Sequence, residues 1–247
     1  MKSNSPYTVI FESAGFISVN KSSGISIGGD RWDESKERLD SIISQDCGYG
    51  KIYTVHRIDR DTSGLVVFAK DQQTHKLLSG AFEERKVAKR YIAVVHGRPH
   101  WDETSCELAL VPNGNKRHMT IIDKFRGKPS VTLFRRLGSA GNYSVLEVMP
   151  ETGRIHQIRV HAASLGFPVV CDSLYGKETP VLLSSFKPGW RGNTNEEKPL
   201  LSRLGLHAME ITLPVEICEH TLKAPLPRDM AAIIKQMEKR SGFKVEI

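Results

Sequence analysis

Residues 55–70, VHRIDRDTSGLVVFAK, place two arginines, two aspartates and a histidine directly before a fully apolar run. Asp59 lies between Arg57 and Arg60, at the edge of what should be the core. Nearby cations would hold this carboxylate ionised, because opposite charges lower the pKa of an acid. The pattern therefore indicates either a reactive carboxylate that works in a negatively charged surrounding, or a structural Arg–Asp pair that stabilises a loop.

A second polar cluster lies in residues 153–161, GRIHQIRVH. His156 and His161 are five residues apart, which separates them by about 140° on a helix and puts them on opposite faces of a strand. They do not have the spacing that would converge on one metal ion, so we expect no zinc site. On a helix Arg159 would share a face with His156 and would be directed at an anion, at Asp59 or into solvent.

Tyr91 lies in a strand-like run at residues 89–97, KRYIAVVHG. Its side chain is either a core residue with the hydroxyl at the rim, or a platform on which a base stacks, with a hydroxyl for proton transfer. Two basic, glycine-containing segments follow at residues 113–120 and 124–132. They are either a hairpin that grips phosphates or solvated loops.

The 247 residues carry a net charge of +7 with a pI near 9.2, which favours polyanionic partners, although a basic surface without a nucleic-acid role has the same totals. The four cysteines form no CxxC pair, which argues against zinc and disulfides and suits a reducing cytosol. No apolar run approaches the about 18 residues of a membrane span, and the first residues lack the apolar stretch of a secretory signal. Phosphate-loop, dinucleotide-binding and nucleophile-elbow motifs are absent from the sequence, and nothing calls for an organic cofactor.

Hydrophobic periodicity alternates short strands with a few helices. We expect a hairpin at 7–13 and 15–21, strands at 51–55, 65–69, 89–97 and 206–217, a hairpin at 131–137 and 143–150, and helices at 30–46, after an Asp71 cap, within 151–166 and at 230–239. We see neither an internal repeat nor a linker. The prediction is an α/β (α+β) protein with one domain on a mixed, mostly antiparallel central sheet, flanked by helices and loops.

The order of these segments resembles the RluA family of RNA pseudouridine synthases. HRIDRDTSGL is similar to its catalytic segment, KRYIAVVHG to its tyrosine-bearing strand, and GRIHQIRVHAASLGFPVVCDSLYG to its long third signature. RLGLHA and KAPLP fall where the closing motifs belong, and FISVNKSSG resembles the entry strand. The resemblance covers roughly residues 7–230 and implies the pseudouridine synthase fold.

Three departures from the family pattern are visible. Ile58 replaces a leucine, Ser22 stands where proline is common, and Cys171 where glycine is usual. None of them touches a residue to which the resemblance gives a catalytic role. We expect a single catalytic domain over residues 1–247, with its core at about 7–240 and without the S4 RNA-binding domain that many relatives carry.

The resemblance implies isomerisation of uridine to pseudouridine in RNA, by base flipping and without a cofactor. Asp59 would be the essential carboxylate, acting either as a nucleophile at C1′ or as a base at C2′, and Arg159 would pair with it. Tyr91 would stack on the uracil and assist removal of the C5 proton. Arg57 would enter the RNA stack, and Leu206 would line the uracil pocket.

We expect the partner to be a structured rRNA or tRNA stem-loop, bound by a cytoplasmic monomer without metal or membrane. The remaining residues expected to contact RNA are His56, Lys89, Lys116, Arg117, Arg154, His156 and Gln157. Two rival interpretations stay open: a non-catalytic RNA-binding or RNA-chaperone protein, and a hydrolase with an aspartate nucleophile. The hydrolase would need a second carboxylate to activate water, and the sequence offers no suitable one.

Overall fold

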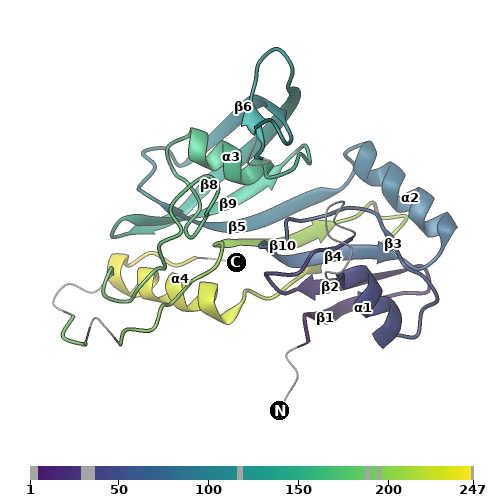
Figure 1. Cartoon of the computed structure of the whole chain (residues 1–247), viewed down its shortest axis with the longest axis horizontal. Coiled ribbons are helices and arrows are strands. Elements are labelled where there is room, and N and C mark those ends of the chain that lie inside the picture. Colours follow the sequence, from purple (N-terminus) through teal and green to yellow (C-terminus); the bar gives the residue numbers. More distant parts are fainter. Residues whose placement is uncertain (1–4, 29–36, 116–118, 187–189, 194–195, 246–247) are drawn as a thin grey trace. The chain divides into compact units, whose positions relative to one another are not determined.

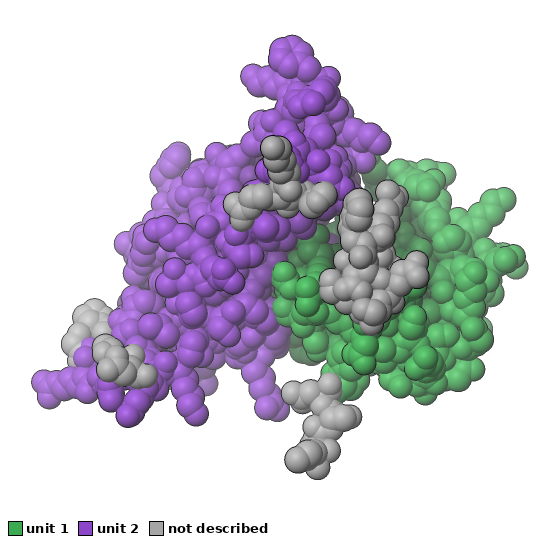
Figure 2. Space-filling model, in the orientation of Figure 1, with its two compact units in different colours: residues 1–90, 207–225 green, residues 91–206, 226–247 purple. Residues whose placement is uncertain are grey.

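The computed structural model describes residues 5–28, 37–115, 119–186, 190–193 and 196–245. The chain divides into two compact units (Figure 2). The first unit comprises Met1–Arg90 and His207–Pro225, and the second comprises Tyr91–Leu206 and Leu226–Ile247. The expectation of one catalytic domain over the whole chain stays a prediction.

In the first unit, strands pair in the order β1-β2-β4-β10, with β3 also on β4 and β11 also on β10 (Figure 1). The pairing of β10 with β4 is parallel and the other pairings of this unit are antiparallel. The elements are β1 (Tyr7–Glu12), β2 (Phe16–Lys21), α1 (Leu39–Asp46), β3 (Tyr53–Thr54), β4 (Ser63–Ala69), α2 (Gln72–Glu83), β10 (Leu206–Thr212) and β11 (Leu222–Lys223).

Strand β4 is the centre of this unit, and all of its residues are buried. Its alternate side chains Leu65 and Val67 join Leu78 of α2 in one apolar cluster. Helix α2 begins where the sequence predicts, because the Asp71 side chain accepts a hydrogen bond of 2.8 Å from the backbone N–H of Thr74. The apolar run after Asp59 is thus a buried strand that anchors the loop before it.

The helix predicted at residues 30–46 is shorter than expected. Residues 30–36 lie outside the described residues, and helix α1 begins only at Leu39. Arg38 instead forms a β-bridge with Ser26, and the N–H groups of Leu39 and Asp40 donate to the carbonyls of Ser26 and Ile27. Tertiary pairing of the backbone therefore overrides the helical periodicity at this end.

In the second unit the strand order is β5-β9-β8-β6-β7, and the pairings are antiparallel. Strand β5 begins in the first unit and continues into the second. The elements are β5 (Ala88–His96), β6 (Glu103–Val111), β7 (Ile121–Ile122), β8 (Lys128–Ala140), β9 (Tyr143–Pro150), α3 (Gln157–Ser164) and α4 (Arg228–Ser241). Phe134 and Val148 of the predicted β8–β9 hairpin pack with Ile158 and Ala162 of α3.

These elements confirm the predicted α+β class with a mixed, mostly antiparallel arrangement of strands. Helix α3 ends as predicted before Gly166, whose φ of +88° suits a residue without a side chain. Strand β6 was missed, because its polar and apolar residues do not alternate strictly. Among the described residues no helix has the length and apolar character needed to cross a membrane.

We expect Gly64→Ala to lower the free energy of unfolding by at least about 2 kcal/mol. Gly64 has a φ of +116°, and a Cβ atom there would overlap the Ala208 carbonyl oxygen of the paired strand β10. Urea denaturation would measure the loss. Gly80→Ala in α2 is the matched control: a Cβ atom there meets nothing within 4 Å, so it should stabilise the helix by about 0.5–1 kcal/mol. Equal stability of the two variants would contradict the strain assigned to Gly64.

Candidate active site

Asp59 lies in the loop between β3 and β4 of the first unit. Its neighbour Ile58 is 6% exposed and fixes the loop to the core, whereas Arg57 is exposed. The Asp59 carbonyl accepts a hydrogen bond of 3.2 Å from the N–H of Thr62, which closes the turn into β4. The structure thus puts Asp59 on a short, anchored loop, half-buried just before the start of the central strand β4.

A buried ammonium group holds this loop. Lys21, at the end of β2, is 1% exposed. Its Nζ donates to the carbonyl oxygens of Ser22 (2.9 Å), Ile25 (3.0 Å) and Arg60 (2.8 Å). Because a buried charge is tolerated only with such partners, the ammonium ties the residue after Asp59 to the turn that follows β2.

Arg60 and Asp61 complete the connection between the two segments. The Arg60 Nε donates to the Gly24 carbonyl at 2.9 Å, and the Gly24 N–H donates back to the Arg60 carbonyl at 2.9 Å. The Ser23 hydroxyl donates to the Asp61 carbonyl at 2.6 Å. Sequence reasoning left Arg60 without a role; in the structure its hydrogen bonds connect the Asp59 loop to the turn at residues 22–25.

Sequence reasoning missed Lys21, although a signal was present. Ile17 and Val19 of the same strand are fully buried, and a period of two puts Lys21 on their face. A lysine in phase with core residues has to find acceptors inside the protein. Here those acceptors are backbone carbonyls, which sequence motifs do not mark.

His56 is occupied by contacts within the first unit. Its Nε2 accepts a hydrogen bond of 2.9 Å from the Val67 N–H, and its ring stacks on Phe82 at 4.5 Å between centroids. Burial, and then the charge of Lys89, lower the pKa of His56 to about 3. His56 is therefore neutral at physiological pH and supplies no positive charge to an RNA phosphate.

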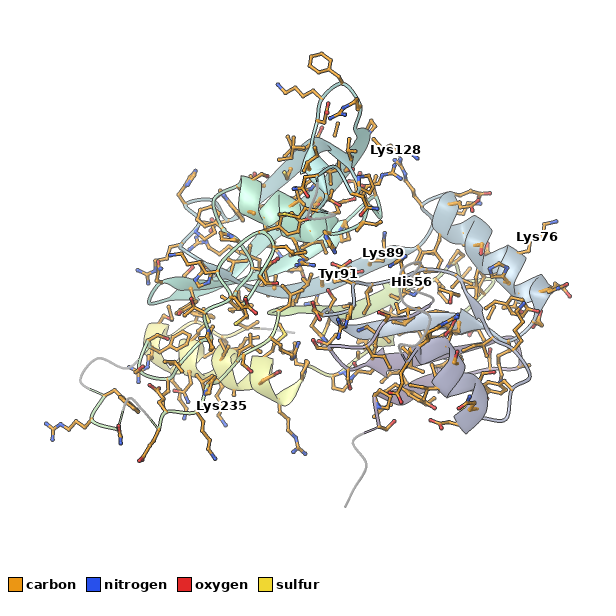
Figure 3. The ribbon with its side chains drawn as sticks, viewed as in Figure 1. His56, Lys76, Lys89, Tyr91, Lys128 and Lys235 are labelled. Atoms are coloured by element: carbon orange, nitrogen blue, oxygen red, sulfur yellow. The ribbon has the colours of Figure 1, made fainter. Side chains whose placement is uncertain are left out.

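Lys89 and Tyr91 lie two residues apart on β5, so their side chains leave the strand on the same side (Figure 3). Burial lowers the pKa of Lys89, and the charge of Arg85 lowers it further. Tyr91 is partly buried against the apolar cluster of the second unit. Arg90, between them, forms an ion pair of 3.0 Å with Glu210 of the first unit.

Arg159 is buried on α3 and forms a bidentate ion pair with Asp172, through Nε and Nη2 at 2.8 Å each. The N–H groups of Leu174 and Tyr175 also donate to this carboxylate. Burial alone would raise the pKa of Asp172, but the hydrogen bonds and charge of Arg159 outweigh it, and the net shift is downward. Sequence reasoning missed Asp172. The predicted pairing of Arg159 with Asp59 joins the two units and stays a prediction.

The start of α3 is held by its own polar network. His156 adopts a left-handed backbone conformation with φ 53°, and its Nδ1 lies 3.0 Å from the Tyr175 hydroxyl. The buried Gln157 side chain accepts from the Thr152 hydroxyl and the Arg154 N–H. Its Nε2 donates to two groups of β8, the Val131 carbonyl and the Thr132 hydroxyl. An RNA contact through the Gln157 amide would require breaking these bonds.

The remaining predicted residues fall in different surroundings. Lys116 and Arg117 lie outside the described residues. Leu206 is 2% exposed within the apolar cluster of the second unit. Arg154 is half-buried, and its Nε lacks a hydrogen-bond partner among the described residues. The described part of the chain contains no group of three His, Cys, Asp or Glu side chains that could hold a metal ion.

Lys21→Met should lower the free energy of unfolding by about 1.5–3 kcal/mol, because three backbone carbonyls lose a charged donor. Lys76→Met, on the exposed face of α2, is the matched control and should change stability little. Urea denaturation of the two variants measures the difference. A Lys21→Met protein as stable as the control would show that the buried ammonium does not hold the loop.

His56→Gln should reduce the acid sensitivity of folding. An unfolded histidine takes up its proton near pH 6.5, but folded His56 does so only near pH 3, so between these values acid favours unfolding. In the wild type, protonation linked to this histidine lowers the free energy of unfolding by up to about 1.4 kcal/mol per pH unit as the pH falls below about 6. Glutamine keeps an acceptor for the Val67 N–H and does not titrate. Unfolding free energies measured from pH 7 to pH 4 should therefore fall less steeply in the variant, and equal slopes would contradict the lowered pKa.

Comparison with known proteins assigns the chain to a family. A sequence model described as RNA pseudouridylate synthase matches residues 15–164. Ribosomal large subunit pseudouridine synthase D of Borreliella burgdorferi is 35% identical over 199 residues, covering 75% of this chain and 61% of that protein. Ribosomal large subunit pseudouridine synthase C of Buchnera aphidicola is 32% identical over 231 residues, covering 90% and 68%. The dual-specificity RNA pseudouridine synthase RluA of Vibrio vulnificus is 35% identical over 178 residues, covering 70% of each chain.

Solved structures agree at the level of the fold. Human RNA pseudouridylate synthase domain containing 4 has a TM-score of 0.70 at 20% identity, covering 93% of this chain and 92% of the other. Human RNA pseudouridylate synthase domain containing 1 has a TM-score of 0.68 at 24% identity, covering 92% and 86%. Because the family match spans more than half of the chain and the curated relatives extend over most of it, the chain belongs to the RNA pseudouridylate synthase family.

Proposed function

We propose that the chain is an RNA pseudouridine synthase, an isomerase that converts uridine in structured rRNA or tRNA to pseudouridine. The observation that carries the proposal is the family match over residues 15–164, a range that includes Asp59, Tyr91 and Arg159. Relatives named for the ribosomal large subunit and for dual-specificity RNA support a structured RNA substrate. The basic pI supports a polyanionic partner. We further propose that the enzyme works as a cytoplasmic monomer without a cofactor.

The proposed reaction breaks the N1–C1′ bond of uridine, turns the uracil, and bonds C5 to C1′. The C5 proton leaves and N1 gains a proton, so the product is an isomer of the substrate. Asp59 either attacks C1′ or removes the C2′ proton, and both roles need an ionised carboxylate. Tyr91 stacks on the uracil and assists removal of the C5 proton. The fixed loop of Asp59 supports these roles, because catalytic groups need a set position.

The target uridine has to leave its stack before Asp59 can act, at a cost of a few kcal/mol. Arg57 is exposed on the Asp59 loop, which supports its proposed entry into the vacated stack. We propose that Leu206 lines the uracil pocket and that Arg159 pairs with Asp59 in addition to Asp172.

The other residues expected to contact RNA divide by their surroundings. Arg154 is half-buried and keeps its proposed phosphate contact. Lys89 and His156 are half-buried and near the proposed site residues in sequence, and Lys116 and Arg117 keep their proposed role. We assign Gln157 to positioning of the residues before α3, since its amide is fully engaged there. We propose that His56 contacts RNA as a neutral ring.

Replacing Asp59 by Asn should lower pseudouridine formation by about 100- to 10,000-fold, because the carboxylate performs the chemical step. Asp61→Asn is the matched control, an exposed carboxylate of the same loop, and should leave the activity unchanged. The measurement is a pseudouridine map of total RNA from a strain that lacks the gene, complemented by each form.

If the Asp59→Asn protein restores the same modification as the wild type, the catalytic assignment is wrong. If the Asp59→Asn protein keeps its full function in the complemented strain, whereas charge reversal at Lys116 or Arg117 destroys that function, the chain is an RNA-binding protein without catalysis. An absence of any site that depends on the gene would overturn the proposed activity itself.

A further inference from the structure

The turn between β7 and β8 in the second unit holds an aromatic ring that is almost wholly exposed. Phe125 is 99% exposed, the largest exposed fraction among the described large apolar residues. The turn consists of residues 123–128, DKFRGK, and ends at β8 (Figure 1). A phenylalanine normally buries its ring, so a ring held in solvent on a turn that links the two strands on either side of β6 requires an explanation.

The turn is built to hold this ring in place. The Asp123 carboxylate accepts hydrogen bonds of 3.0 Å from the N–H groups of Phe125 and Arg126. The Arg126 Nε donates to the same carboxylate at 2.7 Å, and these bonds hold the pKa of Asp123 below its usual value. The Gly127 N–H closes the turn on the Asp123 carbonyl at 2.9 Å. The exposed ring therefore belongs to a turn with a defined, hydrogen-bonded structure.

The turn is also joined firmly to the sheet. The Asp123 N–H donates to the Ala109 carbonyl of β6 at 2.9 Å. A Cβ atom at Gly127 would overlap backbone atoms of Ala109 and Asp123, so only glycine fits this close approach. A rigid turn loses little conformational entropy when it binds a ligand.

Positive charge surrounds the ring. Lys124, Arg126 and Lys128 are exposed, against the single carboxylate of Asp123, and Lys128 is labelled in Figure 3. One ring among three cations is a poor match for a protein partner, because interface cores are depleted of lysine and need about 800 Å² on each side. It matches unpaired RNA, whose bases stack on aromatic rings while cations bind the phosphates.

We propose that the turn at residues 123–128 binds an unpaired nucleotide of RNA, with the Phe125 ring stacked on its base and Lys124, Arg126 and Lys128 on the flanking phosphates. The inference rests on the proposed RNA substrate and adds to it a site that reads single-stranded RNA. Stacking has no requirement for one base, so this turn contributes affinity and the preference for a loop over a paired stem.

The test measures binding of the full-length protein to two labelled RNAs, an oligouridylate of about 12 nucleotides and a duplex of the same length. Phe125→Ala should weaken binding of the single strand by roughly 5- to 150-fold and leave the duplex affinity unchanged. Phe125→Trp should restore the single-strand affinity. Phe125→Leu should not, because leucine is apolar but has no aromatic face.

Val215→Ala provides the matched control, since Val215 is a 68% exposed apolar residue of the first unit and lies outside the turn. It should bind both RNAs as the wild type does. Urea denaturation should show equal stability for all Phe125 variants, because the ring is 99% exposed and substitutions at such positions change stability little.

Three results would overturn the inference: a Phe125→Ala protein with wild-type affinity for the single strand, a Phe125→Leu protein as tight as Phe125→Trp, or equal losses on single strand and duplex. The first would leave a protein partner as the occupant of the turn.

Failure of the proposed activity has a separate readout, because Asp59→Asn should keep the oligouridylate affinity while the pseudouridine map changes. On a substrate RNA, Phe125→Ala should raise KM and leave kcat unchanged, as loss of uniform binding does.

Discussion

The ammonium group of Lys21 lies inside the first unit, where a charge without partners would be expensive. Three backbone carbonyls surround it, and one belongs to Arg60, next to Asp59. The same interaction that makes the buried charge tolerable therefore fixes the loop that carries the proposed catalytic carboxylate. Strand β4 secures the other end of this loop, because all of its side chains are buried.

The second unit uses a buried ion pair in a similar way. Arg159 on α3 and Asp172 in the following loop bind each other through two hydrogen bonds, and two backbone N–H groups also donate hydrogen bonds to the carboxylate. A buried pair adds less to stability than its charges suggest, because both groups lose water. Its contribution is a fixed geometry, in which the guanidinium of Arg159 and the segment around Tyr175 hold each other.

Charge is used differently inside the protein and on its surface. In the interior Lys21, Arg159 and Asp172 are matched by specific partners, and burial keeps His56 neutral. On the surface the turn at residues 123–128 keeps its cations exposed around an aromatic ring. With the proposed activity on RNA, this division would separate the groups that fix the proposed reacting residues from the groups proposed to contribute affinity.

The sequence by itself determined the residue types that could do chemistry and most of the elements that carry them. Local patterns were sufficient for the β8–β9 hairpin, the Asp71 cap of α2 and the end of α3 at Gly166, because each depends on residues close together in the chain. The predicted start of α1 was wrong, because the backbone of Arg38 pairs with that of the distant Ser26. Only the tertiary structure decided the partners of Lys21, Arg60 and Arg159. The partners of Lys21 and Arg60 are backbone carbonyls, and the partner of Arg159 is a carboxylate 13 residues further along the chain. Neither kind of partner lies at a fixed spacing that a sequence motif would reveal.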